Sequence, residues 1–175
     1  MTAARPTDAR ETGQGLRVRL ATAADHEAVG ALVLAAYAGF LSGPDDPYAA
    51  RLRDTAARAA RAEVWVAADP SGEVLGSVTI CPDGSPWREI ARPDEGEFRM
   101  LAVAPSAQGR GVGARLVDLV VERSRAEGRR AVVLSSLAQM RAAHRVYERF
   151  GFVAVPERDW RPSPDVFLRA YRLAL

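Results

Sequence analysis

Apolar and charged residues alternate where the patterned part of the chain begins. Leu16–Leu20 reads LRVRL, and such alternation is typical of a strand with one buried face. Similar short runs predict six further strands, at 63–68, 73–80, 97–103, 131–134, 152–155 and 166–173. The run at 131–134, AVVL, is apolar at every position, which is typical of a parallel strand that is covered on both faces.

Other segments repeat apolar residues every three or four positions, which predicts helices. These segments are 22–38, 47–61, 112–128 and 138–150. Thr22 and Asp25 stand where a capping box would begin the first helix, and Gly39 follows its expected end at Ala38. Gly128 and Gly151 are expected to end the last two helices.

The order of these elements predicts one α+β domain over residues 16–175. It would have a mixed sheet of about six to seven strands flanked by about four helices. Residues 1–15 are small and polar without an apolar centre, so we expect a flexible tail and no secretory signal. No apolar run approaches the ~18 residues of a membrane span, and we expect a cytoplasmic protein.

Composition excludes several chemistries. All 24 basic residues are Arg, so no mechanism that needs a lysine is available, and the net charge of +2 is too small to indicate a nucleic-acid binder. Cys81 is the single cysteine and is expected to be a buried thiol. Because His26 and His144 are far apart in sequence and have no carboxylate at metal-ligand spacing, we expect no metal site.

The most informative segment is a glycine-rich turn between a predicted strand and a predicted helix, at 108–114. Its sequence, QGRGVGA, leaves backbone N–H groups bare at the positive end of a helix, which favours a phosphate or pyrophosphate ligand. A Walker A loop would need a lysine. A dinucleotide fingerprint remains open by spacing alone, because some such folds accept alanine at the position of Ala114. The turn lies past mid-chain, however, and not in a first βαβ unit.

This segment resembles the GNAT family of acetyltransferases. Gln108–Gly113 is similar to the family's Q/R-x-x-G-x-G/A coenzyme A motif, and Leu101–Val103 to its L-x-V strand end. Tyr147–Phe152, YERFGF, resembles the family's Y-x-x-x-G-F element at the usual distance. The likeness extends from about Leu16 to the C-terminus and is strongest over 97–152.

The resemblance implies that acetyl-CoA is the co-substrate, and it implies where this molecule lies. The backbone N–H groups of the turn would bind its pyrophosphate, and its pantetheine arm would follow the strand where that strand splays from its neighbour. A backbone N–H in the strand would meet the thioester carbonyl. The residues expected to contact the cofactor are Leu101, Ala102, Val103, Gln108, Gly109, Arg110, Gly111, Val112, Gly113, Ala114, Met140 and Ala143.

The resemblance also implies catalytic roles for Glu97 and Tyr147. Glu97 would take the proton of the attacking amine, directly or through water, although it could equally be a solvated or Arg-paired carboxylate. By strand alternation it would share a face with Arg99, Leu101 and Val103. Tyr147 would protonate the leaving thiolate, or else simply pack on the core.

Two further positions bear on this site. His144 is expected on the helix surface. Met140 replaces a frequent asparagine of the family, so that Ser135, Ser136 or Gln139 would have to supply its contact with the pantetheine arm.

The acceptor would be a small-molecule or peptide amine, attacked directly in a ternary complex. A cluster of acidic side chains would favour a cationic amine, although arginines lie in the same region. The acidic residues are Asp45, Asp46, Asp94, Glu95 and Glu97. Two other functions remain open: a non-catalytic acyl-CoA sensor or interaction domain, and a dinucleotide-binding domain. A homodimer is a further expectation by analogy.

Overall fold

The computed structural model describes residues 10–11, 15–43 and 45–175. The expected tail therefore lies mostly outside the described residues. Within the range expected to be a tail, Arg10–Glu11 forms the short strand β1, which pairs with β2 (Arg17–Leu20). At these two positions the structure has a strand where a tail was expected.

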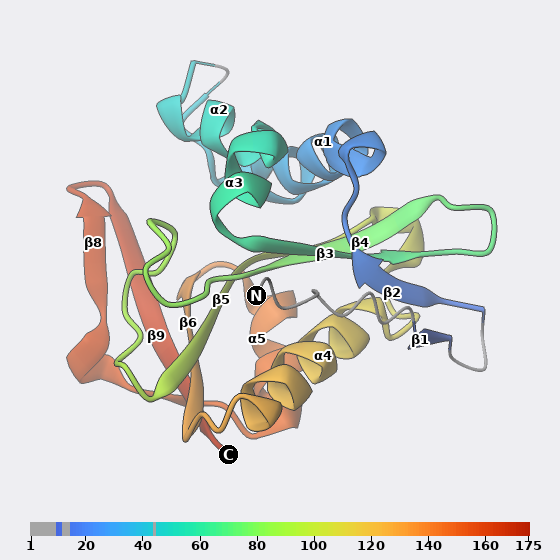
Figure 1. The fold of residues 1–175 in the computed structure, drawn as a ribbon. Helices are drawn as coiled ribbons and strands as arrows, with labels where there is room; N and C mark the ends of the chain where they lie inside the picture. The colour runs from blue at the N-terminus through green and yellow to red at the C-terminus, as the bar shows by residue number, and fades with distance from the viewer. Residues whose placement is uncertain (1–9, 12–14, 44) are drawn as a thin grey trace.

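Within the described residues, nine strands form one mixed sheet in the order β1-β2-β3-β4-β5-β6-β9-β7, and β8 pairs with β9 (Figure 1). All neighbours are antiparallel except β5 and β6, which are parallel. The remaining strands are β3 (Glu63–Ala68), β4 (Val74–Ile80), β5 (Glu95–Val103), β6 (Ala131–Leu137), β7 (Val153–Ala154), β8 (Trp160–Ser163) and β9 (Val166–Ala174). The predicted α+β class with a mixed sheet is confirmed.

Two strands, β1 and β8, were not predicted. β8 contains Pro162, which has no N–H to donate and argues against a strand inside a sheet. The proline is tolerated because β8 pairs only with β9, so its other edge needs no hydrogen-bond donor.

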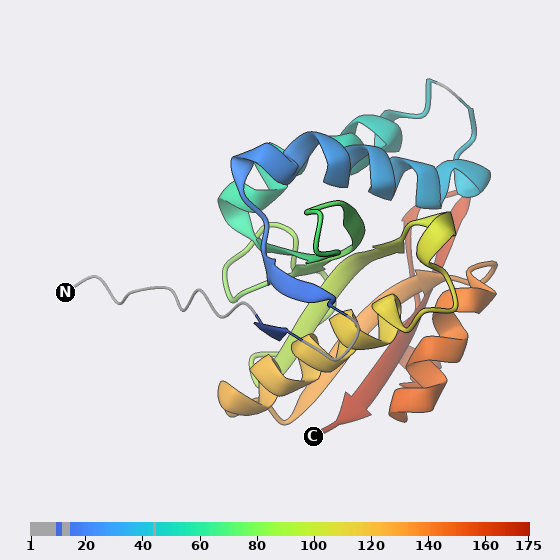
Figure 2. The same ribbon diagram turned by 90° about the vertical axis from the view of Figure 1, so that its right-hand side faces the viewer.

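Helices cover both faces of the sheet (Figures 1 and 2). α1 (His26–Tyr37), α2 (Pro47–Arg53) and α3 (Thr55–Arg61) lie on one face. α4 (Val112–Ala126) and α5 (Arg141–Phe150) lie on the other. No helix among the described residues is long and apolar enough to cross a membrane.

The described residues hold five α-helices where about four were expected, because the predicted helix at 47–61 is two helices. The break falls at Asp54, whose ψ of 75° is not helical. Its side chain accepts the backbone N–H of Ala57 at 2.9 Å and so caps α3. An aspartate that caps a new helix competes with continuation of the old one.

The start of the first helix follows the prediction. Asp25 Oδ2 accepts the backbone N–H of Thr22 at 2.7 Å, and Arg19 pairs with the same carboxylate at 2.7 Å. This arginine is the main reason that the pKa of Asp25 is lowered. The end differs, because a 3-10 turn, Ala38–Phe40, continues the chain through Gly39.

The core is divided by the sheet. On the α4 and α5 side, Leu116 and Val120 pack with Phe98 and Leu134. On the α1 side, a second set of buried residues includes Val29, Val33, Leu52, Trp87 and Met100. β5 contributes to both sets, so its two faces are fixed from opposite directions.

Candidate active site

The glycine-rich turn has the open backbone that the sequence predicts. Gly109 and Gly111 have φ values of 76° and 78°, a region that side chains with a Cβ rarely adopt. At neither glycine does any heavy atom lie within 4 Å of the place where a Cβ would stand. Gly111 is also the N-cap of α4, so the turn leads directly into the positive end of a 15-residue helix.

Most of the amides in this turn are free. Gln108 and Arg110 donate their N–H groups to carbonyls of the preceding turn, at 3.4 and 3.3 Å. Among the described residues, no acceptor is found for the remaining five N–H groups, those of Gly109, Gly111, Val112, Gly113 and Ala114. Successive free N–H groups at a helix N-terminus can bind a phosphate.

Three elements meet at this turn. A Cβ on Gly113 would lie 3.4 Å from Val103 Cγ2 of β5 and 3.9 Å from Val146 Cγ2 of α5. Val103, one of the predicted cofactor residues, therefore lies beside the turn and beside α5.

β5 and β6 separate within the sheet. Their parallel pairing covers only Glu95 to Glu97, after which β5 pairs with β4 alone and β6 with β9 alone. Met100 has a φ of 52°, and the register between β4 and β5 shifts between Ser77 and Thr79. The expected splay is thus present, with a β-bulge in it, and it leaves one backbone edge of β5 unpaired beyond Glu97.

The bulge corrects the predicted faces of β5. Leu101 packs with the core on the α4 side, and Val103 packs against it, whereas Met100 and Ala102 belong to the α1 side. Glu97 and Arg99 make their contacts with the loop at 82–94, away from Leu101. Simple alternation failed because the extra residue of a bulge shifts every later side chain to the opposite face.

Glu97 is buried and holds this loop. The residue is 1% exposed, and its carboxylate accepts the backbone N–H groups of Glu89, Ile90 and Ala91 at 2.9 to 3.1 Å. The carboxylate therefore has three fixed donors. Its role as a base stays a prediction.

Tyr147 lies in an aromatic cluster on α5. Its ring centroid is 5.9 Å from that of Phe98 and 5.9 Å from that of Phe152. Burial raises its pKa, with smaller contributions from Tyr37 and Tyr171, so the phenol keeps its proton at physiological pH. Among the described residues, its hydroxyl has no hydrogen-bond partner, which leaves the O–H available to a ligand.

His144 is buried, not on the helix surface as expected. Its Nε2 lies 3.0 Å from Ser136 Oγ, and its Nδ1 lies 3.4 Å from the Tyr171 hydroxyl. Burial lowers the pKa of the imidazole. The ring was misplaced because a polar residue on an amphipathic helix is usually exposed, and this one has two buried polar partners that sequence spacing does not reveal.

Residues at the start of α5 lie beside this cluster. Met140 is the half-buried N-cap of α5, and Ala143 packs against the core of the α4 side. Ser135 Oγ accepts the Trp160 Nε1–H at 3.0 Å, and Ser136 is occupied by His144. Of the three residues considered as replacements for the family's asparagine, only Gln139 has a side chain that makes no hydrogen bond to the described residues.

Three of the five carboxylates on which a cationic acceptor was based have partners within the chain. Asp46 caps α2, where it accepts the N–H of Tyr48 at 2.9 Å. Glu95 pairs with Arg158 and Arg172, at 2.8 and 2.9 Å. Together with Glu97, these carboxylates are held in place by partners within the chain.

Sequence reasoning missed a polar group on the α1 side of β5. Arg99 Nη1 lies 2.7 Å from Glu89 Oε1, and Arg99 also reaches the Trp87 carbonyl and the Tyr48 hydroxyl. Glu89 lies in a loop that is rich in Pro, Gly and charged residues. The available signal was Trp87 itself, because a tryptophan inside a polar loop indicates a loop that packs on the core.

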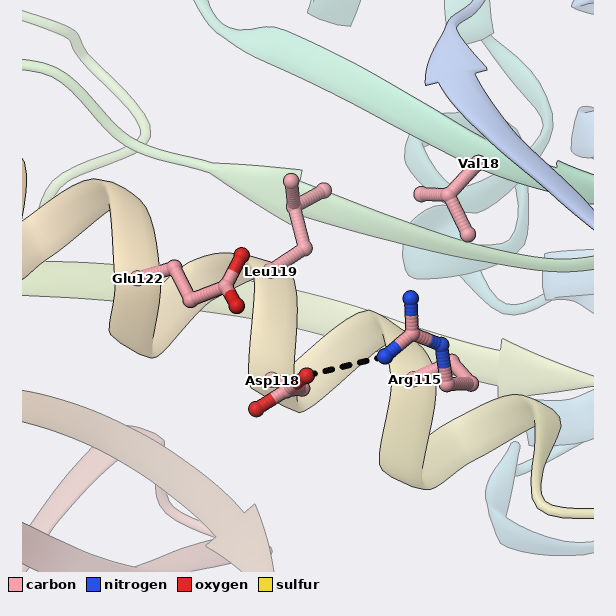
Figure 3. Close-up of a pocket in the computed structure, with 5 residues that line it drawn as sticks. All are labelled: Val18, Arg115, Asp118, Leu119 and Glu122. Carbon is pink, nitrogen blue, oxygen red and sulfur yellow. Dashed lines mark hydrogen bonds and ion pairs between the residues drawn. The ribbon is translucent and has the colours of Figure 1, made fainter. Parts of the chain in front are cut away.

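A small hollow lies elsewhere, between β2 and α4 (Figure 3). Arg115 and Asp118 form an ion pair at 3.0 Å at its edge, beside Val18. It encloses about 10 Å³, which is near the space that one water molecule needs. It is therefore too small for coenzyme A.

No group of three or more His, Cys, Asp or Glu side chains suited to a metal ion occurs among the described residues. Cys81 is 2% exposed, and burial raises the pKa of its thiol to about 12. The thiol is thus inert at physiological pH, as its expected burial implied.

Residues 26–152 match the family model described as the Acetyltransferase (GNAT) family. This range contains the glycine turn, the splayed strand and Tyr147. The chain belongs to the GNAT family. The resemblance seen in the sequence is therefore confirmed.

Individual GNAT relatives agree with this assignment. A structure of a GCN5-related N-acetyltransferase from Kribbella flavida superposes with a TM-score of 0.69 at 26% identity, covering 94% of this chain and all of that one. A GNAT acetyltransferase from Brucella melitensis, solved in complex with acetyl-CoA, gives a TM-score of 0.61 at 23% identity, over 93% of this chain and 89% of that one. The second likeness shows the fold alone.

A curated relative is the mycothiol acetyltransferase of Cellulomonas flavigena. It is 33% identical over 119 residues, which are 61% of this chain and 33% of the relative. The chain thus spans about a third of the length of that enzyme.

Proposed function

We propose that this chain binds acetyl-CoA at the glycine turn and transfers the acetyl group to a primary amine by direct attack in a ternary complex. The observation that carries the proposal is the run of open amides at the head of α4, next to the splay between β5 and β6. Membership of the GNAT family and the acetyl-CoA in the Brucella melitensis relative support it.

The cofactor would lie across both features. Its pyrophosphate would accept hydrogen bonds from the free N–H groups that begin at Gly109. Its pantetheine arm would pair with the open edge of β5 at Leu101–Val103, as a strand would. A backbone N–H there would donate to the thioester oxygen as negative charge develops on it. Met140, Gln139 and Ala143, at the start of α5, would lie beside the same path.

The chemical step needs two proton movements. The neutral amine attacks the thioester carbon, a C–N bond forms, and the C–S bond breaks to release the thiolate. Glu97 is the proposed acceptor of the amine proton, directly or through a water molecule. In that role, one of its oxygens would exchange a loop N–H donor for the amine or the water.

Tyr147 is the proposed proton donor to the thiolate. Its hydroxyl is without a partner among the described residues, and its raised pKa keeps the phenol protonated at physiological pH. Because burial also weakens the phenol as an acid, its O–H would act first as a hydrogen-bond donor to the developing thiolate. A donor that acts on the leaving group contributes mainly in the transition state, so its loss should lower kcat more than cofactor affinity.

A thiol-release assay over a broad panel of amines, with mass spectrometry of the products, tests the proposal. We expect release that depends on acceptor and a product heavier by one acetyl group. Double-reciprocal plots of initial rate at several fixed concentrations of the second substrate should give intersecting lines. The protein itself should carry no acetyl group. Acetyl-CoA binding without release over the whole panel would favour a sensor instead, and parallel lines with an acetylated protein would contradict direct attack.

A further inference from the structure

Arg99 and Glu89 form an ion pair that is close to the bulge in β5. The two side chains are 10% and 19% exposed, and their nearest atoms are 2.7 Å apart. The pair is thus mostly removed from water but still reachable. Arg99 is the residue before Met100, where β5 has just separated from β6.

Among the described residues, the guanidinium has one charged partner within ion-pair distance, Glu89. Its other hydrogen bonds, to the Trp87 carbonyl and the Tyr48 hydroxyl, are 3.3 and 3.4 Å long and neutral. Its carbon lies 5.9 Å from the centre of the Trp87 ring. Glu89 is therefore the partner that a ligand carboxylate could replace.

The pair also lies beside the proposed base. The backbone N–H of Glu89 donates to Glu97 Oε2 at 3.0 Å, and Arg99 follows Glu97 by two positions in β5.

A second buried cation stands on the same side. Arg58 is completely buried and bonds to the carbonyls of Arg51 and Leu52 and to Thr55 Oγ1, with no carboxylate in contact among the described residues. Glu97 also acts on Arg99 from a distance, so Arg58 is the cation on this side that has no carboxylate in contact among the described residues. It favours an acceptor with an anionic group.

We propose that the acceptor is an α- or β-amino acid, which inserts between Glu89 and Arg99. Its carboxylate would bind the guanidinium of Arg99, and its amino group would bind Glu89. The inference rests on the proposed function and adds the substrate class. A zwitterion gives each member of the pair a new partner, so neither charge is left buried and alone. Because the two side chains start 2.7 Å apart, they would have to separate least for an acceptor whose amine and carboxylate are two or three bonds apart.

Matched acceptors test this substrate class. Phenylalanine, its primary amide and phenethylamine share a side chain and differ at the carboxylate. Because their amines differ in pKa, kcat/KM is calculated from the concentration of the unprotonated amine in each case. β-Alanine and its amide form a second set without the ring. In at least one set, we expect kcat/KM for the amino acid to exceed that for its analogues without a carboxylate by roughly 10-fold or more. This is the size of effect expected when a hydrogen bond to a charged group is lost. In Arg99→Gln this preference should fall to within about 2-fold.

Arg51→Gln is the matched control. Arg51 also lies over the Trp87 ring, at 4.8 Å, but forms no ion pair with Glu89 and acts on it only at longer range, so Arg51→Gln should keep the preference. Unfolding and acetyl-CoA titrations on each variant check folding and cofactor binding. Should Arg99→Gln fail to fold, Glu89→Gln replaces it, with the expected result that KM for the acid rises roughly 10-fold or more.

The outcomes separate the inference from the proposed function. Equal or better use of the amides and phenethylamine by the wild type overturns the amino-acid inference and leaves the acetyltransferase intact. Retention of the preference in Arg99→Gln also overturns it. Absence of acetyl-CoA binding overturns both.

Discussion

Glu97 Oε2 accepts the backbone N–H of Ala91 at 2.9 Å, across the gap between β5 and the loop that precedes it. The same carboxylate also accepts the N–H groups of Glu89 and Ile90. One buried side chain thus fixes the loop that carries Glu89. The proposed base and the proposed acceptor site are therefore coupled through this loop.

Glu97→Gln should lower both stability and rate. An amide nitrogen would face at least one N–H donor, so we expect a loss of about 1–3 kcal/mol in the free energy of unfolding. Urea unfolding measures the loss, and faster amide exchange at 89–91 locates it. The exposed Glu157→Gln is the control and should change neither. A variant that loses stability but retains the wild-type kcat would remove Glu97 from the chemistry.

Tyr147→Phe should reduce kcat by roughly 100- to 10,000-fold and leave the Kd for acetyl-CoA within about 2-fold. The ring contacts with Phe98 and Phe152 remain, so folding should not suffer. Steady-state kinetics and calorimetric titration give the two numbers. Tyr171→Phe removes a hydroxyl from the same cluster and should retain most of the rate. A variant of Tyr147 with unchanged kcat would contradict the proton-donor role.

His144 should make the fold less stable in mild acid. Its pKa is lowered in the folded state by burial, so the unfolded chain binds the proton more readily. The stability that this neutral imidazole contributes is present above the ordinary histidine pKa of about 6.5. It is lost as the pH falls through that value toward the lower folded pKa.

Urea unfolding between pH 7.5 and 5.5 measures this dependence, and the two pH limits are chosen to lie roughly one unit either side of the ordinary histidine value. His144→Gln should weaken the dependence, whereas His26→Gln, which changes the only other histidine, should preserve it. An equal slope in wild type and His144→Gln would show that another group is responsible.

The sequence was most informative where structure is local. The glycine turn, its position at the head of α4 and the caps at Asp25 and Gly151 all follow from residues within a few positions of one another. Gly151, for example, has the left-handed φ of 87° that its role at the end of α5 requires. Such features depend on backbone preferences that each residue carries with it.

Features set by distant contacts were not predicted. Met100 adopts a positive φ because two flanking strands diverge there, and no property of methionine favours this conformation. The pairing of Arg99 with Glu89 and the burial of His144 depend on how a loop and a strand pack. Most of the fold and the cofactor turn could therefore be predicted, but the acceptor side of the site could not.

Acetyl-CoA titration of Gly111→Ala against Gly84→Ala tests the central claim most directly. The two glycines have φ values of 78° and 75°, and at both the space that an added Cβ would occupy is clear of heavy atoms to 4 Å, so both substitutions impose the same backbone strain. Only Gly111 borders the free amides at the head of α4. We predict that Gly111→Ala weakens binding by roughly 10-fold or more, as for the loss of charge-assisted hydrogen bonds, while Gly84→Ala binds like the wild type. Equal affinity of both variants, or no binding by the wild type at low salt, would contradict the account.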